Sequence, residues 1–210
     1  MTEQTFKNFK IISFKVGQMR TNCYLILNPE KKIAVLIDPG FLTDELENYI
    51  KANQIKIEFI LLTHGHFDHM LAINQIKTNA VYINQLEKDF LTDGFKNAGA
   101  FMGYSNFKMP SNLKTFKNGD KIPFLDEEFF VIHTPGHTLG SSCFVFLNKI
   151  IFTGDTLFKN TVGRWDLFSG NLADLKNSVE ILKKLNKNYF AFPGHGDFFK
   201  LDSSCFINLF

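Results

Sequence analysis

Residues 57–69 read IEFILLTHGHFDH and decide both the fold and the chemistry of this chain. The apolar run from Ile57 to Leu62 is typical of a strand in a sheet that is covered on both faces. After Thr63, four side chains of metal-binding type follow within six residues: His64, His66, Asp68 and His69. Imidazole and carboxylate groups suit Zn²⁺ and its first-row neighbours. Four of them are too many for one tetrahedral ion on a single loop, so we expect the loop to serve two ions.

The missing ligands are expected at the ends of other strands. The chain has six histidines, three of them in this loop. His137 lies in a Pro-Gly turn between apolar segments, and His195 follows the apolar stretch 189–192. Asp155 follows the apolar stretch 150–152. Any one of them alone would be read as an ordinary polar turn residue. Their shared placement at strand ends, where loops on a rigid scaffold often hold sites, favours a metal centre.

The order of the motifs resembles that of a known family. TH-x-H-x-DH, a lone histidine, GDT and PGHG follow one another as in the metallo-β-lactamase superfamily. The chain is most similar to its short, single-domain, glyoxalase II-like (hydroxyacylglutathione hydrolase-like) members, from VGQMRTNCYLI near the start to the last residues. The resemblance implies an α/β fold, the four-layer αβ/βα sandwich. We expect one domain over residues 1–210, which the length allows.

The resemblance also implies a role for each ligand. One ion is expected to bind three histidines, the other a carboxylate and two histidines, and Asp155 and a water to bridge the pair. The two sets are His64, His66 and His137 for the first ion, and Asp68, His69 and His195 for the second. We expect two divalent ions, foremost Zn²⁺, with Fe or Mn as alternatives. Asp38 follows the apolar run IAVLI. The resemblance implies that it supports the metal-binding loop by orienting a ligand, although capping of the turn alone would explain an aspartate here.

The expected reaction is hydrolysis of a small thioester by metal-bound hydroxide. The chain has no G-x-S-x-G motif, and five of its six histidines are assigned to metal. Metal binding lowers the pKa of water from about 16 to near 7. A thiolate, with a pKa near 8.5, leaves with little help from an acid. Asp68 is the one metal-bound group that could act as a catalytic acid. The resemblance implies S-2-hydroxyacylglutathione or a related acyl thiol as the substrate.

Other functions remain open at this point. A mononuclear iron persulfide dioxygenase shares much of the ligand set. A β-lactamase is disfavoured because MTEQTFKNFK does not look like a secretion signal, and a nuclease because the charge is near neutral. A binding module with structural metals is disfavoured because structural sites tend to be saturated by protein ligands.

Two features bear on substrate contacts. Arg164 is a candidate anchor for a substrate carboxylate, unless it forms an internal ion pair with Asp166. The irregular segment 94–112 forms either part of a substrate rim or a covered insertion.

Long glyoxalase II enzymes hold glutathione through a C-terminal helical domain, which we do not expect in the fifteen residues after His195. His133 is expected to be structural.

The composition is that of a globular protein, with 210 residues, 45% of them hydrophobic, and 25 phenylalanines. Basic residues exceed acidic ones by 23 − 21 = 2, and no block of like charge occurs. We therefore expect a small-molecule substrate and neither nucleic acid nor a membrane as partner. Three widely spaced cysteines are expected to be reduced and buried, which indicates a cytoplasmic protein. The oligomeric state is left open.

Hydrophobic periodicity and turn signals predict the secondary structure. A hairpin is expected over 119–133, with its turn signal at 118–120. Helices are expected at 43–52, 68–77, 85–91 and 172–185, and further strands at 9–16, 23–28, 33–37, 57–62, 81–83, 142–147, 150–152 and 189–192.

Overall fold

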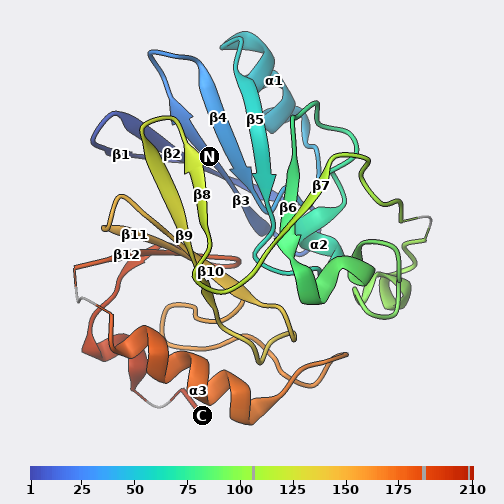
Figure 1. Cartoon of the computed structure of the whole chain (residues 1–210), viewed down its shortest axis with the longest axis vertical. Helices are drawn as coiled ribbons and strands as arrows, with labels where there is room; N and C mark the ends of the chain where they lie inside the picture. The colour runs from blue at the N-terminus through green and yellow to red at the C-terminus, as the bar shows by residue number, and fades with distance from the viewer. Residues whose placement is uncertain (106, 186–187, 208) are drawn as a thin grey trace. The chain divides into compact units, whose positions relative to one another are not determined.

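The computed structural model describes residues 1–105, 107–185, 188–207 and 209–210. It divides into two compact units, which we treat separately (Figure 1). The first unit comprises residues 1–62, 66–83 and 90–114, and the second comprises residues 63–65, 84–89 and 115–210. The boundary between them passes through the loop that follows the strand of residues 56–61. The prediction of a single domain stays a prediction.

The first unit is built on a seven-stranded mixed sheet whose strands lie in sequence order. Its first four strands pair antiparallel, and the fourth, fifth and sixth pair parallel. Parallel strands end at the same edge of a sheet, so the loops that follow the fourth and fifth strands emerge together. The strands are β1 Thr2–Phe6, β2 Phe9–Val16, β3 Thr21–Asn28, β4 Ile33–Ile37, β5 Lys56–Leu61, β6 Val81–Asn84 and β7 Leu113–Phe116.

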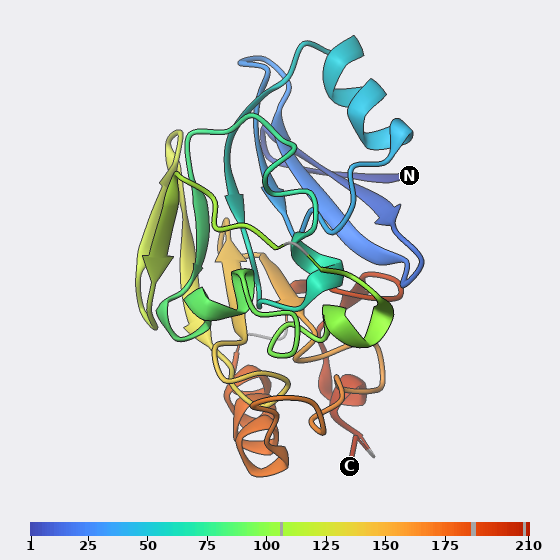
Figure 2. The same ribbon diagram turned by 90° about the vertical axis from the view of Figure 1, so that its right-hand side faces the viewer.

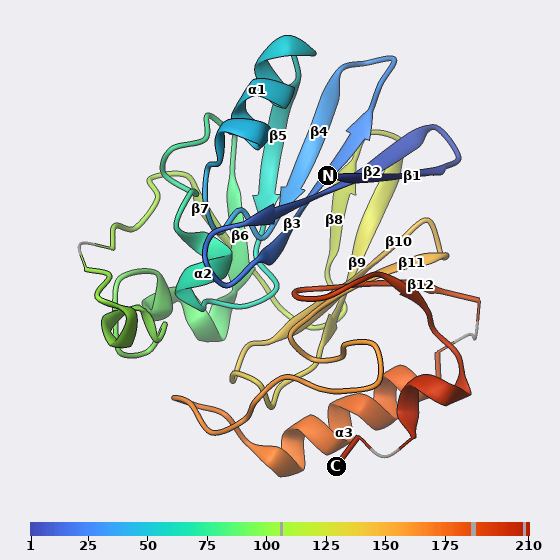
Figure 3. The ribbon, with the colours of Figure 1, turned by 180° about the vertical axis from the view of Figure 1, so that it is seen from behind.

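Helix α1, Asp44–Ala52, lies against this sheet (Figure 3). The Thr43 hydroxyl caps it by accepting a hydrogen bond from the Leu46 amide at 3.3 Å. Three acidic residues in its first turn suit the positive end of the helix dipole. Leu46 joins a core that includes Phe14, Leu36 and Ile60. The shorter helical segments are α2 Phe67–Met70 and the 3₁₀ helices η1 Gln85–Leu91 and η2 Gly99–Met102.

The second unit contains a six-stranded sheet in the order β13-β12-β11-β10-β9-β8. Neighbouring strands pair antiparallel except β11 and β12, which are parallel. Many phenylalanines fill its core, and the rings of Phe129 and Phe146 stack with centroids 4.5 Å apart. The elements are β8 Lys121–Phe124, β9 Glu127–His133, β10 Ser142–Phe146, β11 Ile150–Gly154, α3 Leu172–Lys183, β12 Phe190–Pro193, β13 Phe199–Lys200 and η3 Ser203–Phe206.

The predicted helix over 68–77 is wrong beyond its first turn. Helix α2 ends at Met70, and the chain then continues in turns. The amide of Ala72 donates to the carbonyl of Pro39 at 3.0 Å, not to a carbonyl one helical turn earlier. The hydrogen-bond ladder of a helix therefore cannot continue through this position. Of the apolar residues that suggested a longer helix, Met70 and Ile73 are buried, whereas Leu71 and Ile76 are half-buried.

The hairpin over 119–133 is confirmed, but its turn lies elsewhere. Strands β8 and β9 are joined by the two-residue connection Leu125-Asp126. Leu125 has φ of 55°, which leucine rarely adopts, so the sequence gives no sign of this turn. The expected turn at 118–120 instead precedes β8. Strand β1 was missed because its side chains are largely exposed and polar.

Several further predictions are confirmed. The class is α/β, and the helices and strands around the predicted site fall within a few residues of the expected positions. The three cysteines are buried free thiols. Burial raises the pKa of Cys23 and raises that of Cys143 to about 12, so neither thiol is a nucleophile near neutral pH. Among the described residues, we find no helix with the length and apolar character needed to cross a bilayer.

Candidate metal centre

The loop that follows β5 places four polar side chains in buried positions. His64, His66, Asp68 and His69 are 1%, 4%, 6% and 0% exposed. Burial of ionisable groups in this number is unfavourable unless they are hydrogen-bonded or bind a cation. The boundary between the two units falls in this loop, so His64 belongs to the second unit and the other three to the first.

In the second unit, four predicted ligands lie together: His64, His137, Asp155 and His195. The Nε2 atoms of His64 and His137 are 3.2 Å apart. The Oδ2 atom of Asp155 lies 3.6 Å from Nε2 of His137 and 3.5 Å from Nε2 of His195. Asp155 and His195 follow the parallel strands β11 and β12, and the Gly194 amide donates to the Gly154 carbonyl at 2.8 Å. The parallel pairing therefore places both side chains at one edge of the sheet.

The tautomer of His137 is set by its neighbour. Its Nδ1 lies 2.7 Å from the backbone carbonyl oxygen of Arg164. A carbonyl oxygen can only accept, so Nδ1 carries the proton and Nε2 presents a lone pair. A Cβ added to Gly163 would lie 2.0 Å from the carbonyl oxygen of Asp155 and 3.0 Å from Nδ1 of His137. Glycine at 163 therefore permits the close approach of this loop to two of the predicted ligands.

In the first unit, His66, Asp68 and His69 lie on or beside α2, and Asp38 supports His69. Nδ1 of His69 is 3.0 Å from Oδ2 of Asp38, so this nitrogen donates and Nε2 is left as the lone-pair atom. Nε2 of His69 is 3.5 Å from Oδ2 of Asp68. The Thr21 hydroxyl donates to the same oxygen of Asp68 at 2.6 Å. The imidazole of His69 is thus fixed in the orientation and tautomer that a metal ligand needs.

The turn that carries Asp38 is shaped to fit against the ligand loop. Asp38 adopts φ of 53°, in the left-handed region that aspartate tolerates better than most residues. Its amide donates to the carbonyl of Leu61 at 3.0 Å. A Cβ added to Gly40 would lie 1.5 Å from the carbonyl oxygen of Asp68. Only glycine at position 40 allows the turn after β4 to approach the loop after β5 this closely.

Arg164, predicted either as a substrate anchor or as a partner of Asp166, lies in the internal pair. Its Nε and Nη2 atoms donate to the two carboxylate oxygens of Asp166 at 2.7 and 2.8 Å. Both side chains are exposed. The Arg164 side chain lowers the pKa of Asp166 to about 2, chiefly by hydrogen bonding. Nε2 of His133 donates a hydrogen bond to the carbonyl of Leu139 at 2.8 Å.

Segment 94–112, whose residue 106 lies outside the described part, is tied to α2 (Figure 2). The Phe67 amide donates to the Asn97 carbonyl at 2.9 Å. The rings of Phe67 and Tyr104 stack with centroids 5.1 Å apart. Phe95 and Phe101 remain 69% exposed. The segment therefore buttresses Phe67, which lies between the predicted ligands His66 and Asp68, and also offers aromatic surface.

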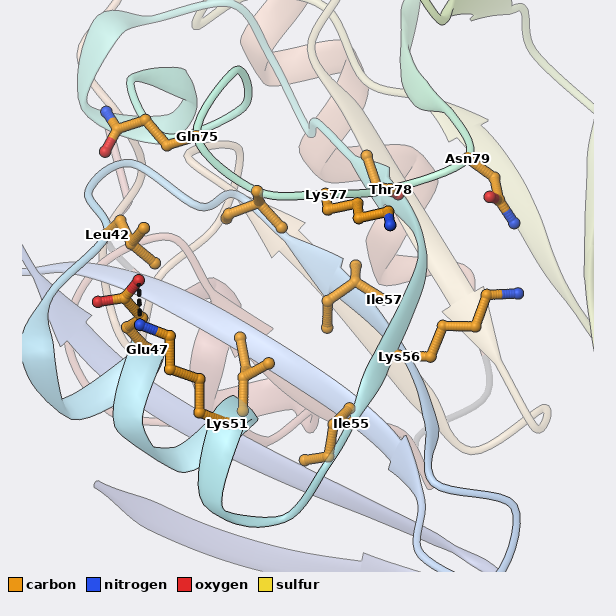
Figure 4. A pocket seen from close by; sticks show the side chains of 12 residues that line it. Leu42, Glu47, Lys51, Ile55, Lys56, Ile57, Gln75, Lys77, Thr78 and Asn79 are labelled. Atoms are coloured by element: carbon orange, nitrogen blue, oxygen red, sulfur yellow. Dashed lines mark ion pairs between the residues drawn. The ribbon is translucent and has the colours of Figure 1, made fainter.

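A hollow of about 450 Å³ in the first unit is not the metal centre (Figure 4). It lies at the beginning of β5, whereas the ligand loop follows the end of that strand. Apolar side chains such as Ile55 and Ile57 line it. Its one carboxylate, Glu47, forms an ion pair with Lys51 at 2.8 Å. A site with this lining lacks the imidazole and free carboxylate groups that would hold a metal ion.

Sequence reasoning missed several groups that orient the predicted ligands. These are the Thr21 hydroxyl, the Arg164 carbonyl and the carboxylate of Glu87, which accepts hydrogen bonds from two loop amides. Thr21 and the G-R-W-D motif that contains Arg164 can be read in the sequence. The ligands that they contact, however, lie far away in the chain. The contacts could not be inferred from local pattern.

A family comparison now identifies the superfamily. Residues 16–195 match the family model described as the metallo-beta-lactamase superfamily. The chain belongs to this superfamily. The matched region contains all seven predicted ligands, with His195 as its last residue.

Members with similar sequences include proteins with and without a stated activity. An uncharacterized protein of Mycobacterium leprae is 34% identical over 199 residues, which cover 89% of this chain and 91% of that protein. Hydroxyacylglutathione hydrolase GloC of Haemophilus influenzae is 34% identical over 197 residues, covering 91% and 92%. The probable metallo-hydrolase YqgX of Bacillus subtilis is 33% identical over 189 residues, covering 86% and 87%.

Two solved structures confirm the predicted fold. BLEG-1, a B3 metallo-beta-lactamase, matches with a TM-score of 0.81 and 30% identity, covering 91% of this chain and 94% of that one. TTHA1623, solved in a di-iron-bound form, matches with a TM-score of 0.76 and 29% identity, covering 90% and 94%. The metallo-β-lactamase fold is therefore the fold of this chain. Superfamily membership and the His and Asp groups indicate divalent metal ions without deciding their identity or number.

Proposed function

We propose that the chain is a dinuclear metal-dependent hydrolase of small thioesters, of the S-2-hydroxyacylglutathione class. The observation that supports it best is the fixed tautomer of two imidazoles, His137 in one unit and His69 in the other. Each has its Nδ1 bound to an acceptor, so each presents the Nε2 lone pair. Metal-binding histidines typically donate their second ring N–H to an acceptor in this way, which fixes the tautomer and the orientation of the ring. The 34% identity to a hydroxyacylglutathione hydrolase supports the substrate class.

In this proposal the ligands are grouped as the family resemblance implies. One ion would be held by His64, His66 and His137, and the other by Asp68, His69 and His195, with Asp155 shared. Zn²⁺ is the proposed metal, and a bound di-iron centre in a relative that is 29% identical keeps iron as an alternative.

When bound, the ions would supply a nucleophile from water near neutral pH and polarise the substrate carbonyl. The residues of the chain hold the ions and orient the ligands. Asp68 receives a hydrogen bond from Thr21 on Oδ2, so this oxygen acts as an acceptor. A carboxylate held in this way is a poor proton donor through that atom. A thiolate leaving group, which needs little protonation, therefore suits the arrangement better than an amine.

One finding favours a second candidate, β-lactam hydrolysis. BLEG-1 is a B3 metallo-beta-lactamase and is 30% identical over most of both chains. β-Lactam opening produces an amine leaving group, whose departure needs a proton. Asp68, the proposed catalytic residue in that case, would have to donate through its other oxygen. We place this activity second for that reason.

The deciding experiment is a substrate panel on one purified sample whose metal content is measured first. It compares S-lactoylglutathione, a simple acyl thioester, an oxygen ester, a β-lactam and a phosphodiester by kcat/KM at neutral pH. We expect the thioesters to be hydrolysed at least about tenfold faster than the others. Comparable cleavage of the β-lactam would favour the second candidate. Iron together with oxygen consumption on a persulfide would favour a dioxygenase instead.

A further inference from the structure

Glu87 is a fully buried carboxylate that belongs to none of the predicted ligand sets. It lies in η1, within the second unit, and is 0% exposed. Its Oε2 accepts a hydrogen bond from the backbone amide of Gly65 at 2.5 Å. Its Oε1 accepts one from the backbone amide of Gly140 at 2.7 Å. Backbone amides that donate to both oxygens of a carboxylate fix its orientation.

The two amides belong to two different ligand loops. Gly65 follows His64 directly, and Gly140 lies three residues after His137. We propose that Glu87 is a positioning residue that clamps the His64 loop to the His137 loop and so sets the approach of the two imidazoles. Their Nε2 atoms are 3.2 Å apart. The inference deepens the proposed metal-dependent function and rests on it.

The space around Glu87 is shaped for this clamp. A Cβ added to Gly140 would lie 2.6 Å from Cγ and 3.0 Å from Cδ of Glu87. Glycine at 140 is therefore needed for its amide to reach the carboxylate. The hydroxyl of Thr138 also hydrogen-bonds Glu87, next to the predicted ligand His137. The carboxylate thus contacts one side of the His64 loop and two positions of the His137 loop.

Neighbouring buried polar residues tie the same segments together. Nδ2 of Asn84 donates to Oγ of Ser142 at 3.1 Å. The amide of Ser142 donates to the carbonyl of Thr63, adjacent to His64, at 2.9 Å. Asn84 and Glu87 therefore both contact the segment 140–142, and Glu87 also contacts the His64 loop. These hydrogen bonds reach the ligand loops through the backbone amides of Gly65 and Gly140 and the backbone carbonyl of Thr63.

A structural role in stability alone does not account for a glutamate here. Burying a carboxylate is unfavourable, and an apolar side chain of similar volume would be accommodated more easily. Among the described residues, Glu87 is the one buried glutamate. What a carboxylate provides, and an apolar side chain does not, is two acceptors at a fixed separation facing two backbone donors. A buried glutamate at position 87 is explained if it fixes the spacing of the His64 and His137 loops, even at some cost in folding stability.

The test compares wild type with Glu87→Gln. Glutamine keeps the shape but faces one loop amide with its own NH₂ group, so one of the two hydrogen bonds is lost. We expect Zn²⁺ affinity, measured by competition with a chelator, to fall about 10- to 100-fold, the range seen when residues that orient ligands are changed. The absorption spectrum of the Co²⁺-loaded variant should also differ from that of wild type. Excess metal should restore occupancy.

Leu182→Ala is the matched control. Leu182 is buried in the core of the same unit, lies on α3 and belongs to neither loop. Its truncation should lower the melting temperature and leave metal affinity unchanged. If Glu87→Gln binds Zn²⁺ as tightly as wild type and gives the same Co²⁺ spectrum, the clamp is refuted. If both variants lose affinity in proportion to their stability, the role is one of general stability and the proposal is also refuted.

A measurement on the unmodified protein covers the case in which the variant does not fold. In metal-free wild type, the amides of Gly65 and Gly140 should be strongly protected from hydrogen exchange, unlike exposed loop amides. Rapid exchange of both would overturn the clamp. A wild type that binds no metal and cleaves no thioester would instead refute the proposed function, so the two failures are distinguishable.

Discussion

Nδ1 of His137 lies 2.7 Å from the backbone carbonyl oxygen of Arg164. This relationship reverses the expected importance of Arg164, because its backbone orients a predicted ligand while its side chain pairs with Asp166 in solvent. The peptide geometry of the loop, and not the guanidinium, then determines the position of His137. Glycine at 163 makes that geometry possible, since a side chain there would collide with the Asp155 carbonyl.

The first prediction compares two neighbouring substitutions in this loop. Gly163→Ala should reduce metal occupancy strongly, because the added Cβ displaces the loop from Asp155 and His137. Arg164→Ala should leave occupancy unchanged, keep KM within about threefold and shift Tm by less than about 3 °C, as expected for an exposed ion pair. Metal analysis, steady-state kinetics and calorimetry measure the three quantities. A rise of KM of about fivefold or more in Arg164→Ala would restore the substrate-anchor hypothesis.

The second prediction concerns the support of His69 by Asp38. Asparagine tolerates the left-handed backbone at position 38, so Asp38→Asn should fold with the same turn. It replaces a charged acceptor by a neutral one opposite Nδ1 of His69. We expect metal affinity to fall about 10- to 100-fold. Chelator competition measures the effect, and Asp44→Asn on the surface of α1 serves as the control. Unchanged affinity in Asp38→Asn would contradict a supporting role.

The third prediction concerns the sharing of Asp155. Its Oδ2 lies within 3.6 Å of Nε2 of both His137 and His195. If Asp155 serves both ions, Asp155→Ala should lower the metal content from about two ions per chain to well below one, not to one. His133→Ala should retain full content, because His133 contacts the Leu139 carbonyl. Retention of one tightly bound ion in Asp155→Ala would show that the carboxylate belongs to a single ion.

How far the sequence could predict these features depends on where their partners lie. The predicted ligands end apolar strands, a position that is recognisable locally, and the structure brings four of them together in one unit. The 68–77 helix failed because the amide of Ala72 bonds to Pro39, more than thirty residues earlier in the chain. Apolar spacing alone could not reveal that competing acceptor.

Glu87 shows the same limit at the site itself. In the sequence it stands in LEKD, which reads as a charged, solvent-facing turn of helix. In the interior its carboxylate accepts hydrogen bonds from the amides of Gly140, 53 residues later, and Gly65, 22 residues earlier. Backbone donors such as these have no signature in the identity of neighbouring side chains. The Arg164 carbonyl is hidden for the same reason, since every residue has one.

The last prediction uses the titration of Glu87 in the metal-free protein. Loss of solvation in the interior, opposed by hydrogen bonds from Thr138, Gly140 and Gly65, raises the pKa of Glu87 from 4.5 to about 7. Because the pKa is raised, the folded state binds more protons than the unfolded state between these two values. The stabilisation is therefore fully present below pH 4.5 and is lost as the pH rises to 7. A shift of this size corresponds to about 3 kcal/mol of unfolding free energy.

The measurement is denaturant unfolding of chelator-treated wild type and Glu87→Gln at pH 5 and pH 7.5. All other ionisable groups are common to the two proteins, so the difference between the two pH dependences isolates Glu87. We expect wild type to lose about 2–3 kcal/mol more than the variant over this interval, because a glutamine has no proton to lose. Identical pH dependences would mean that Glu87 is ionised throughout, with its two loop amides compensating fully for the loss of solvation. The clamp would then cost no stability at neutral pH, and Glu87→Gln should be less stable than wild type at both pH values.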